Sequence, residues 1–386
     1  MGSLPVRAEL EAFSTLPIGM LAAVYFVGFI IGCINGSRMI RRVGHIRTFA
    51  ALSSIAAAMA FALAFLVDPI AWWILRFVIG ICFAGLYVVI ESWLNDRTES
   101  THRGAIMSTY TFINFGVLIV GQLLLTTYRP SGFELFSVVA ILLGLALVPV
   151  SLTTAPSPSQ PENVRLDIRG LWRLSPVGFV GCLAVGLANG SFWTLGPIFA
   201  SRSGLDIDNL VYFMIGTTLA GALMQWPLGR LSDVTDRRFI IIGTGICAVV
   251  AGILLSAWPE PSTTLLIILA SVYGGVAMPP YAVSVAHAND FAEDDSFVAT
   301  AGGLLLVYGI GAAAGPLIAS RLMQYLGTGG LFLFTTVVHG GLVVFTILRV
   351  RIRAAPAQQN RSDFVAVPQT SPMLYEMDPR SEAETK

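Results

Sequence analysis

The chain has 386 residues, of which 55% are apolar or aromatic and only 12% are charged, and its mean hydropathy is +0.75. Soluble globular proteins carry about 25% charged residues, so this composition indicates a membrane protein. The 23 basic and 23 acidic side chains leave no net charge, and without a basic stripe we expect no nucleic-acid partner.

Apolar windows follow one another along most of the chain. A helix needs about 20 apolar residues to cross a bilayer, and windows of that length, bounded by charged residues, Pro or Gly, predict eleven spans. The predicted fold is therefore an all-α polytopic membrane protein. The spans lie near 16–37, 48–67, 70–92, 104–126, 134–153, 176–198, 208–228, 239–258, 264–287, 298–322 and 328–349.

Arginine is unevenly distributed between alternate loops. One set of loops, together with residues 349–353 at the end of the last span, holds fifteen arginines, and the other set with the N-terminal segment holds four. Because positively charged loops stay in the cytoplasm, we expect a multi-pass protein of the cytoplasmic (inner) membrane. Its C-terminus is expected inside and, with an odd number of spans, its N-terminus outside.

Two polar stretches divide the chain. Residues 154–175 contain several prolines and are predicted to be a cytoplasmic linker between an N-terminal half of five spans, residues 1–153, and a C-terminal half of six, residues 176–350. Residues 351–386 have no long apolar run, which predicts a disordered cytoplasmic tail.

Three motifs resemble those of the major facilitator superfamily (MFS). The loop after the seventh span matches the pattern G-x-x-x-D-x-x-G-R-R at Gly229, Asp233, Arg237 and Arg238, with Asp236 where the family has Gly. It aligns with the loop that begins at residue 37 in the first half, as expected for duplicated halves. The third span resembles the family's R-x-x-x-G motif at residues 76–80, and the tenth its G-x-x-x-G-P motif at 311–316. Residues 88–92 and 225–233 resemble the YcaD-like bacterial subgroup.

The resemblance implies a two-half helical bundle of twelve helices. Only five spans precede the linker, so the motif matches imply that the family's first helix is missing from the sequence, and Met1–Pro5 could be its end. Our hypothesis is a late start site, with twelve helices once an upstream segment is restored. The alternative is a genuine variant with eleven helices.

Several polar side chains within the spans are candidates for a substrate cavity. Arg76 is the strongest, because an arginine at the centre of a membrane helix costs about 2.5 to 3.5 kcal/mol and often has a functional role; the alternative is that it only binds neighbouring carbonyl groups. Glu91 could carry a coupling proton, or could be a boundary carboxylate bonded to loop amides. For each of the others, hydrogen bonding between helices is the stronger alternative. They are Tyr110, Asn114, Asn189, Trp193 and Tyr281.

The loops and glycines suggest how two halves could move. Arg41 stands where the family motif has Asp, and we expect it to face Asp294 and Asp295 in a charge-swapped latch. Asp233 is expected to face Arg103. Arg42, Arg237 and Arg238 complete the gating loops. Small residues let helices approach closely, and the resemblance places one such set between the halves: Gly28, Gly32, Gly36, Gly311, Gly315 and Pro316.

The sequence therefore favours a secondary active or facilitative transporter of a small solute that works by alternating access. Its expected partners are that solute, the lipid bilayer and a coupling proton, with no cofactor or metal and a monomeric state. A non-transporting receptor or scaffold on the same fold is the alternative. A membrane-embedded enzyme ranks last, because no Ser/His/Asp, Cys/His or H-E-x-x-H grouping occurs at a shared depth of the predicted spans.

Overall fold

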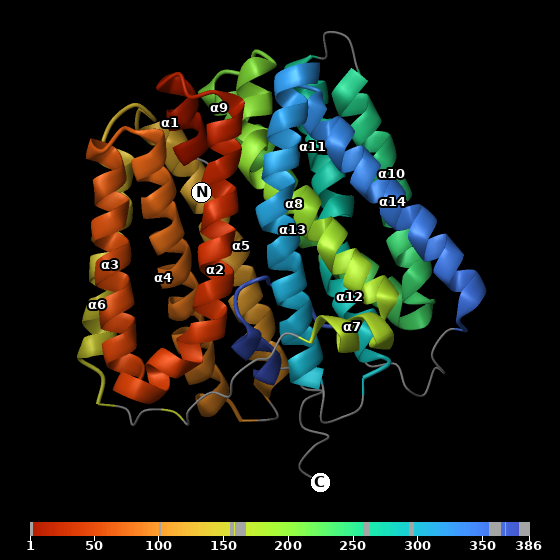
Figure 1. Ribbon diagram of the computed structural model, residues 1–386, viewed down its shortest axis with the longest axis horizontal. Coiled ribbons are helices and arrows are strands. Elements are labelled where there is room, and N and C mark those ends of the chain that lie inside the picture. Colours follow the sequence, from red (N-terminus) through yellow and green to blue (C-terminus); the bar gives the residue numbers. More distant parts are fainter. Residues whose placement is uncertain are drawn as a thin grey trace.

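The computed structural model describes residues 3–99, 102–154, 158, 167–257, 262–292, 297–354, 364–366 and 368–377. These residues form helices and connecting turns, with no strand among them. Eleven of the helical segments are long and apolar enough to cross a membrane, and they stand side by side in one bundle (Figure 1). The expected all-α polytopic fold with eleven spans is confirmed.

Every predicted span overlaps one of these helical segments. Several helices extend past the predicted windows because charged residues continue them beyond the hydrocarbon, as Arg41 and Arg42 do at the end of α2. The first half contains α1 (Ser3–Leu10), α2 (Thr15–Val43), α3 (His45–Phe65), α4 (Pro69–Arg97), α5 (Arg103–Thr127) and α6 (Glu134–Ser151). The second contains α8 (Pro176–Arg202), α9 (Ile207–Val234), α10 (Arg237–Ala257), α11 (Thr263–Ala277), α12 (Pro280–Asn289), α13 (Phe297–Leu326) and α14 (Gly330–Ile352).

Helix starts follow local sequence signals. The Asp68 carboxylate accepts a hydrogen bond from the backbone amide of Ala71 at 2.9 Å, and Pro69 opens α4. Ser175 caps α8 in the same way, with Pro176 as its first residue. A polar cap satisfies a helix N–H that has no partner within the helix, and proline costs nothing there because its missing N–H is one of those groups.

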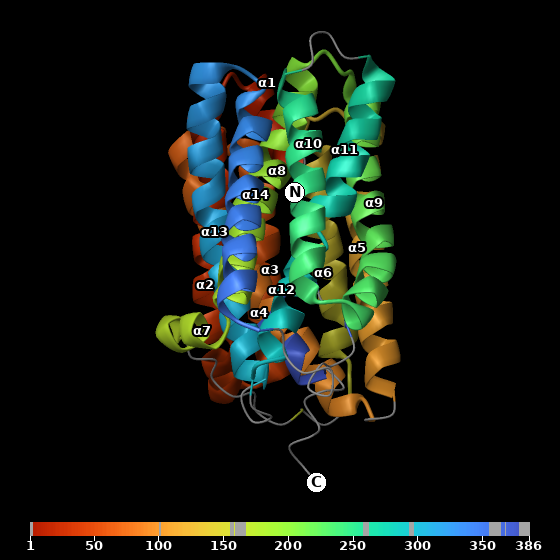
Figure 2. The same ribbon diagram turned by 90° about the vertical axis from the view of Figure 1, so that its right-hand side faces the viewer.

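The linker and the tail both contain a short helix. In the predicted linker, α7 (Ile168–Leu174) lies on the outside of the bundle (Figure 2). The 3-10 helix η4 (Pro372–Met377) lies in the predicted disordered tail, yet it packs inside the bundle (Figure 2). The prediction of a uniformly disordered tail is therefore wrong, because it overlooked the apolar run Met373–Leu374–Tyr375.

The two ends of the bundle differ. We call the end where α1 lies the α1 end and the opposite end, where η4 lies, the tail end (Figure 1). At the α1 end the halves touch directly: Arg202 of α8 donates to Glu9 at 2.7 Å and to Thr15 at 3.1 Å. Gln122 of α5 donates to Thr218 of α9 at 3.1 Å, also toward this end. At the tail end, η4 lies against both α4 and α13.

The small-residue motifs lie mostly within each half. A Cβ atom on Gly28 would come within 2.2 Å of the Phe77 carbonyl oxygen of α4, and one on Gly315 within 2.1 Å of the Leu187 carbonyl oxygen of α8. Gly32 and Gly36 likewise face α4, and Gly311 faces α8. The helices α2 and α13 do meet across the halves, as expected, but these glycines face neighbours in their own half, so their expected role in that contact is wrong. They bring α2 onto α4 and α13 onto α8.

Pro316 is the exception in that set. Its carbonyl oxygen would lie 2.7 Å from a Cβ on Gly19 of α2, so α13 approaches the first half at this point. The contact lies toward the α1 end, where the halves are joined.

Candidate functional site

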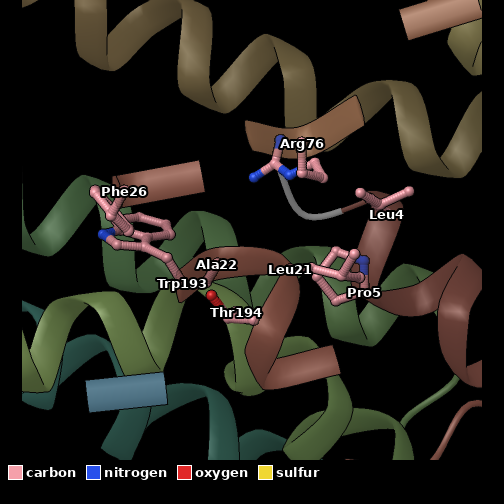
Figure 3. Close-up of a pocket in the computed structure, with 8 residues that line it drawn as sticks. All are labelled: Leu4, Pro5, Leu21, Ala22, Phe26, Arg76, Trp193 and Thr194. Carbon is pink, nitrogen blue, oxygen red and sulfur yellow. The ribbon is translucent and has the colours of Figure 1, made fainter. Parts of the chain in front are cut away.

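A small cavity between the halves contains Arg76. Its volume is about 50 Å³, enough for a few water molecules but below the roughly 300 Å³ of the smallest typical ligand pockets. Figure 3 shows its lining side chains around one space. Arg76 comes from α4 and Trp193 from α8, so both halves contribute. The complete lining is Leu4, Pro5, Leu21, Ala22, Phe26, Arg76, Trp193 and Thr194.

The charge of Arg76 is only partly compensated. Its guanidinium carbon lies 4.3 Å from the centre of the Tyr25 ring, a cation–π contact that stabilises a desolvated cation by about 2 kcal/mol. Its Nε is buried and has no hydrogen-bond partner among the described residues. The cavity lining contains no carboxylate. A bound acceptor group would therefore gain a charge-assisted hydrogen bond here, which is about twice as strong as a neutral one.

A second polar group surrounds Glu91, whose side chain is fully buried. The Tyr110 hydroxyl of α5 donates to its Oε1 at 2.7 Å, and the Ser371 hydroxyl donates to its Oε2. Glu91 is thus held by hydroxyl donors from α5 and from the C-terminal part of the chain. Because Glu91 lies fifteen residues after Arg76 in the same helix, about 22 Å farther along α4, the two groups are separate.

Tyr281 lies just after a break in its membrane span. Pro279 and Pro280 cannot donate backbone hydrogen bonds, so α11 ends at Ala277 and α12 begins at Pro280. The break places Tyr281 in the protein interior, where its hydroxyl lies 2.6 Å from that of Tyr375. The interruption lies beside the C-terminal segment, and Tyr281 does not line the cavity of Arg76.

Of the three remaining cavity candidates, only Trp193 lines the cavity. Trp193 shares the cavity with Arg76, as described. Asn114 donates to the Tyr110 carbonyl oxygen of its own helix at 2.9 Å, which favours the structural alternative for this residue. Asn189 is buried in α8 but does not line the cavity.

The charged loops pair within the second half. Arg237 donates through Nε to Asp290 at 2.8 Å, and both side chains are 1% exposed. Asp233 lies 3.6 Å from Arg237 and accepts the backbone amide of Phe364 at 2.8 Å. Arg103 instead donates to the Glu376 carbonyl oxygen at 3.2 Å. Asp233 and Arg103 thus each bind a C-terminal residue, and the expected pair between them stays a prediction.

The structure describes only the arginine side of the expected latch. Arg41 and Arg42 lie in the last turn of α2, whereas Asp294 and Asp295 fall outside the described residues. The latch therefore stays a hypothesis.

The Asp236–Arg238 pair lies in the loop between α9 and α10. The two side chains approach to 2.6 Å. Partial burial raises the pKa of the Asp236 carboxyl, but the hydrogen bonds and charge of Arg238 outweigh that effect and hold the pKa below its usual value. Asp236, which replaces the family's Gly, thus pairs with one arginine of its own motif.

Metal chemistry finds no support in the described part of the chain, where no three His, Cys, Asp or Glu side chains form a group that could hold an ion. Four C-terminal residues that the sequence reasoning missed bind the candidate side chains or loops: Phe364, Ser371, Tyr375 and Glu376. The signal that could have found them is the apolar run 373–375 within a polar tail.

Comparison with known proteins identifies the architecture. The model of the Major Facilitator Superfamily matches residues 2–287 and 213–374. An MFS-type transporter of Escherichia fergusonii called YcaD, described as uncharacterized, is 27% identical over 332 residues, which is 86% of each chain. YcaD of Escherichia coli K12 is 28% identical over 335 residues, again 86% of each chain.

Solved structures share the fold at low sequence identity. The nucleoside transporter NupG superposes with a TM-score of 0.74 at 13% identity, over 91% of this chain and 94% of that one. A bacterial homologue of the human lysosomal transporter Spinster, in an inward-facing and occupied conformation, superposes with a TM-score of 0.71 at 14% identity, over 94% and 93%.

Proposed function

This chain belongs to the Major Facilitator Superfamily and is a multi-pass membrane transporter, and we propose that it moves a small solute by alternating access between its two halves. The observation that carries this proposal is the cavity of Arg76 and Trp193, to which both halves contribute. A site formed between two helical halves changes its access when one half rocks against the other.

The proposed solute carries an anionic or strongly accepting group. This follows from the buried Nε of Arg76, which has no acceptor among the described residues, and from a lining without carboxylates. Guanidinium groups bind carboxylate and phosphate oxygens through several donors at once. The apolar part of the solute would pack against Phe26 and Trp193.

We assign the tail end to the cytoplasm. The loops with the arginine excess join helix ends on that side, including Arg41 and Arg42 at the end of α2, and positive loops remain cytoplasmic. With this orientation the α1 end, where the halves are joined, faces outward.

The test begins with a thermal-shift screen of the purified protein against organic anions, with matched cations and neutral analogues. A ligand that binds only the folded state raises the melting temperature. We expect hits among the anions that are lost in Arg76→Gln and kept in Arg321→Gln, an arginine outside the cavity. Uptake of each hit into proteoliposomes then separates a transporter from a receptor or scaffold, which binds without flux.

A further inference from the structure

The described C-terminal residues, 364–366 and 368–377, which we call the tail segment, fill the space between the halves at the tail end. We propose that this space is a binding site for the chain's own tail segment, and that the bound segment prevents the tail end from closing. The regulatory part rests on the proposed alternating access, whereas the binding part does not.

The tail segment is bound as a core element rather than as a surface strand. Ser371, Leu374 and Tyr375 are completely buried, and Met373 is 2% exposed. Its apolar side chains point into different halves. Met373 belongs to the apolar cluster of Ile40 and Val89 in the first half.

Leu374 and Tyr375 join a cluster built mainly from the second half, including Val285 and Leu304, which also contains Met107 of α5. Three consecutive residues thus connect both halves.

Polar contacts alternate between the halves along the same segment. Toward the first half, Ser371 bonds Glu91, and the Glu376 carboxylate accepts from Asn95 at 2.9 Å. Toward the second half, Tyr375 bonds Tyr281 at 2.6 Å. Each contact satisfies a polar group that would be costly to bury alone.

The start of the segment is bound by the signature loop of the second half. The Phe364 amide donates to Asp233 at 2.8 Å. The Phe364 ring lies against Gly229, where a Cβ atom would come within 2.2 Å of a ring carbon. The glycine and the aspartate of the loop motif thus form one end of the peptide site.

Closure of the tail end is incompatible with this arrangement. Packed helices lie about 8–10 Å apart, and a helix with its side chains is about 10–12 Å wide. Because η4 lies between α4 and α5 of one half and α13 of the other, those helices can pack together only after η4 leaves. The bound segment therefore holds the transporter in the state described here.

Tethering makes such a site reversible. Phe364 follows the last residue of α14 by only twelve positions, and a short connection of this kind gives an effective concentration in the millimolar range. A segment of modest intrinsic affinity is then mostly bound, yet it can be displaced by a competing ligand or a modification of the tail.

Two substrate-free measurements on the full chain test the proposal, using Leu374→Ala/Tyr375→Ala. The matched control is Tyr325→Ala/Leu326→Ala, the same two residue types side by side but 74% and 58% exposed. Hydrogen–deuterium exchange comes first. We expect slow exchange of residues 368–377 in the parent and the control, and exchange faster by more than about tenfold in the tail variant, given the loss of two large buried side chains. Free-chain exchange rates in the parent would overturn the binding site.

Closure of the tail end is measured by double electron–electron resonance between two spin labels. Labels at Val43 and Val234, exposed residues at the tail ends of α2 and α9, require only the exposed Cys247 to be replaced by Ser. We expect one distance population in the parent and control, and a second, shorter one in the tail variant. A tail that is released while the distances stay unchanged would overturn the regulatory role. Neither measurement needs a solute, so an error in the proposed transport function would not be mistaken for an error here.

Discussion

The buried ion pair of Arg237 and Asp290 provides the sharpest stability test. Both side chains are 1% exposed, and two bonds at 2.8 and 3.3 Å join the guanidinium to the carboxylate. Replacing Arg237 by Ala leaves the carboxylate buried beside a void. Breaking one partner of a buried pair costs about 3 to 5 kcal/mol, chiefly because the remaining charge is uncompensated.

The matched control is Arg202→Ala, because Arg202 also pairs with a carboxylate at 2.7 Å but both side chains are partly exposed. Exposed pairs contribute about 0 to 1 kcal/mol. We therefore expect the free energy of unfolding, measured by titrating the detergent-solubilised protein with SDS, to fall several times more in Arg237→Ala. The double variant Arg237→Ala/Asp290→Ala should recover part of the loss. Equal losses in the two single variants would refute the reasoning.

Three further outcomes follow from particular contacts. Gly28→Val should lower the melting temperature, because overpacking costs about 1–3 kcal/mol of stability. Gly116→Val should leave it unchanged, because no atom lies within 4 Å of the added Cβ. Similar losses in the two variants would contradict the close approach of α2 and α4. Tyr110→Phe removes a donor to buried Glu91 and should destabilise by about 1–3 kcal/mol, and no change would show that the bond is dispensable. The folded-state pKa of Asp236 lies below its usual value, so the stabilisation that its carboxylate provides is present above the unfolded pKa of about 3.9 and is lost as pH falls. The melting temperature of Asp236→Asn should therefore depend less on acid pH than that of the parent. An equal acid dependence in both proteins would exclude a stabilising role for the carboxylate.

Hydropathy made the helices predictable and left their contacts undetermined. The windows located all eleven spans because apolar length is a local property. The break before α12 also has a local cause, because it lies at the proline pair of residues 279 and 280. Gly28 and Gly315 were correctly recognised as close-packing residues, but spacing alone does not say which helix a glycine faces, and both face a neighbour in their own half.

The site was predictable only in part for the same reason. Arg76 stood out because a charge within an apolar span is costly, and its cavity with Trp193 was within reach of the sequence. The partners of Glu91 were not, because Ser371 lies 280 residues later in the chain and in a polar context that suggested disorder. Composition describes the average of a segment, whereas burial of Leu374 and Tyr375 depends on a site formed by distant helices.

The central claim is that this chain carries a solute across the membrane through the cavity of Arg76. The most direct test is uptake of the organic anion with the largest thermal shift into proteoliposomes containing the parent, Arg76→Gln or the control Arg321→Gln. The account predicts time-dependent uptake by the parent and the control, and uptake close to that of empty liposomes for Arg76→Gln, in a protein that still folds. Binding without uptake by the parent would contradict transport, and undiminished uptake by Arg76→Gln would contradict the assigned site.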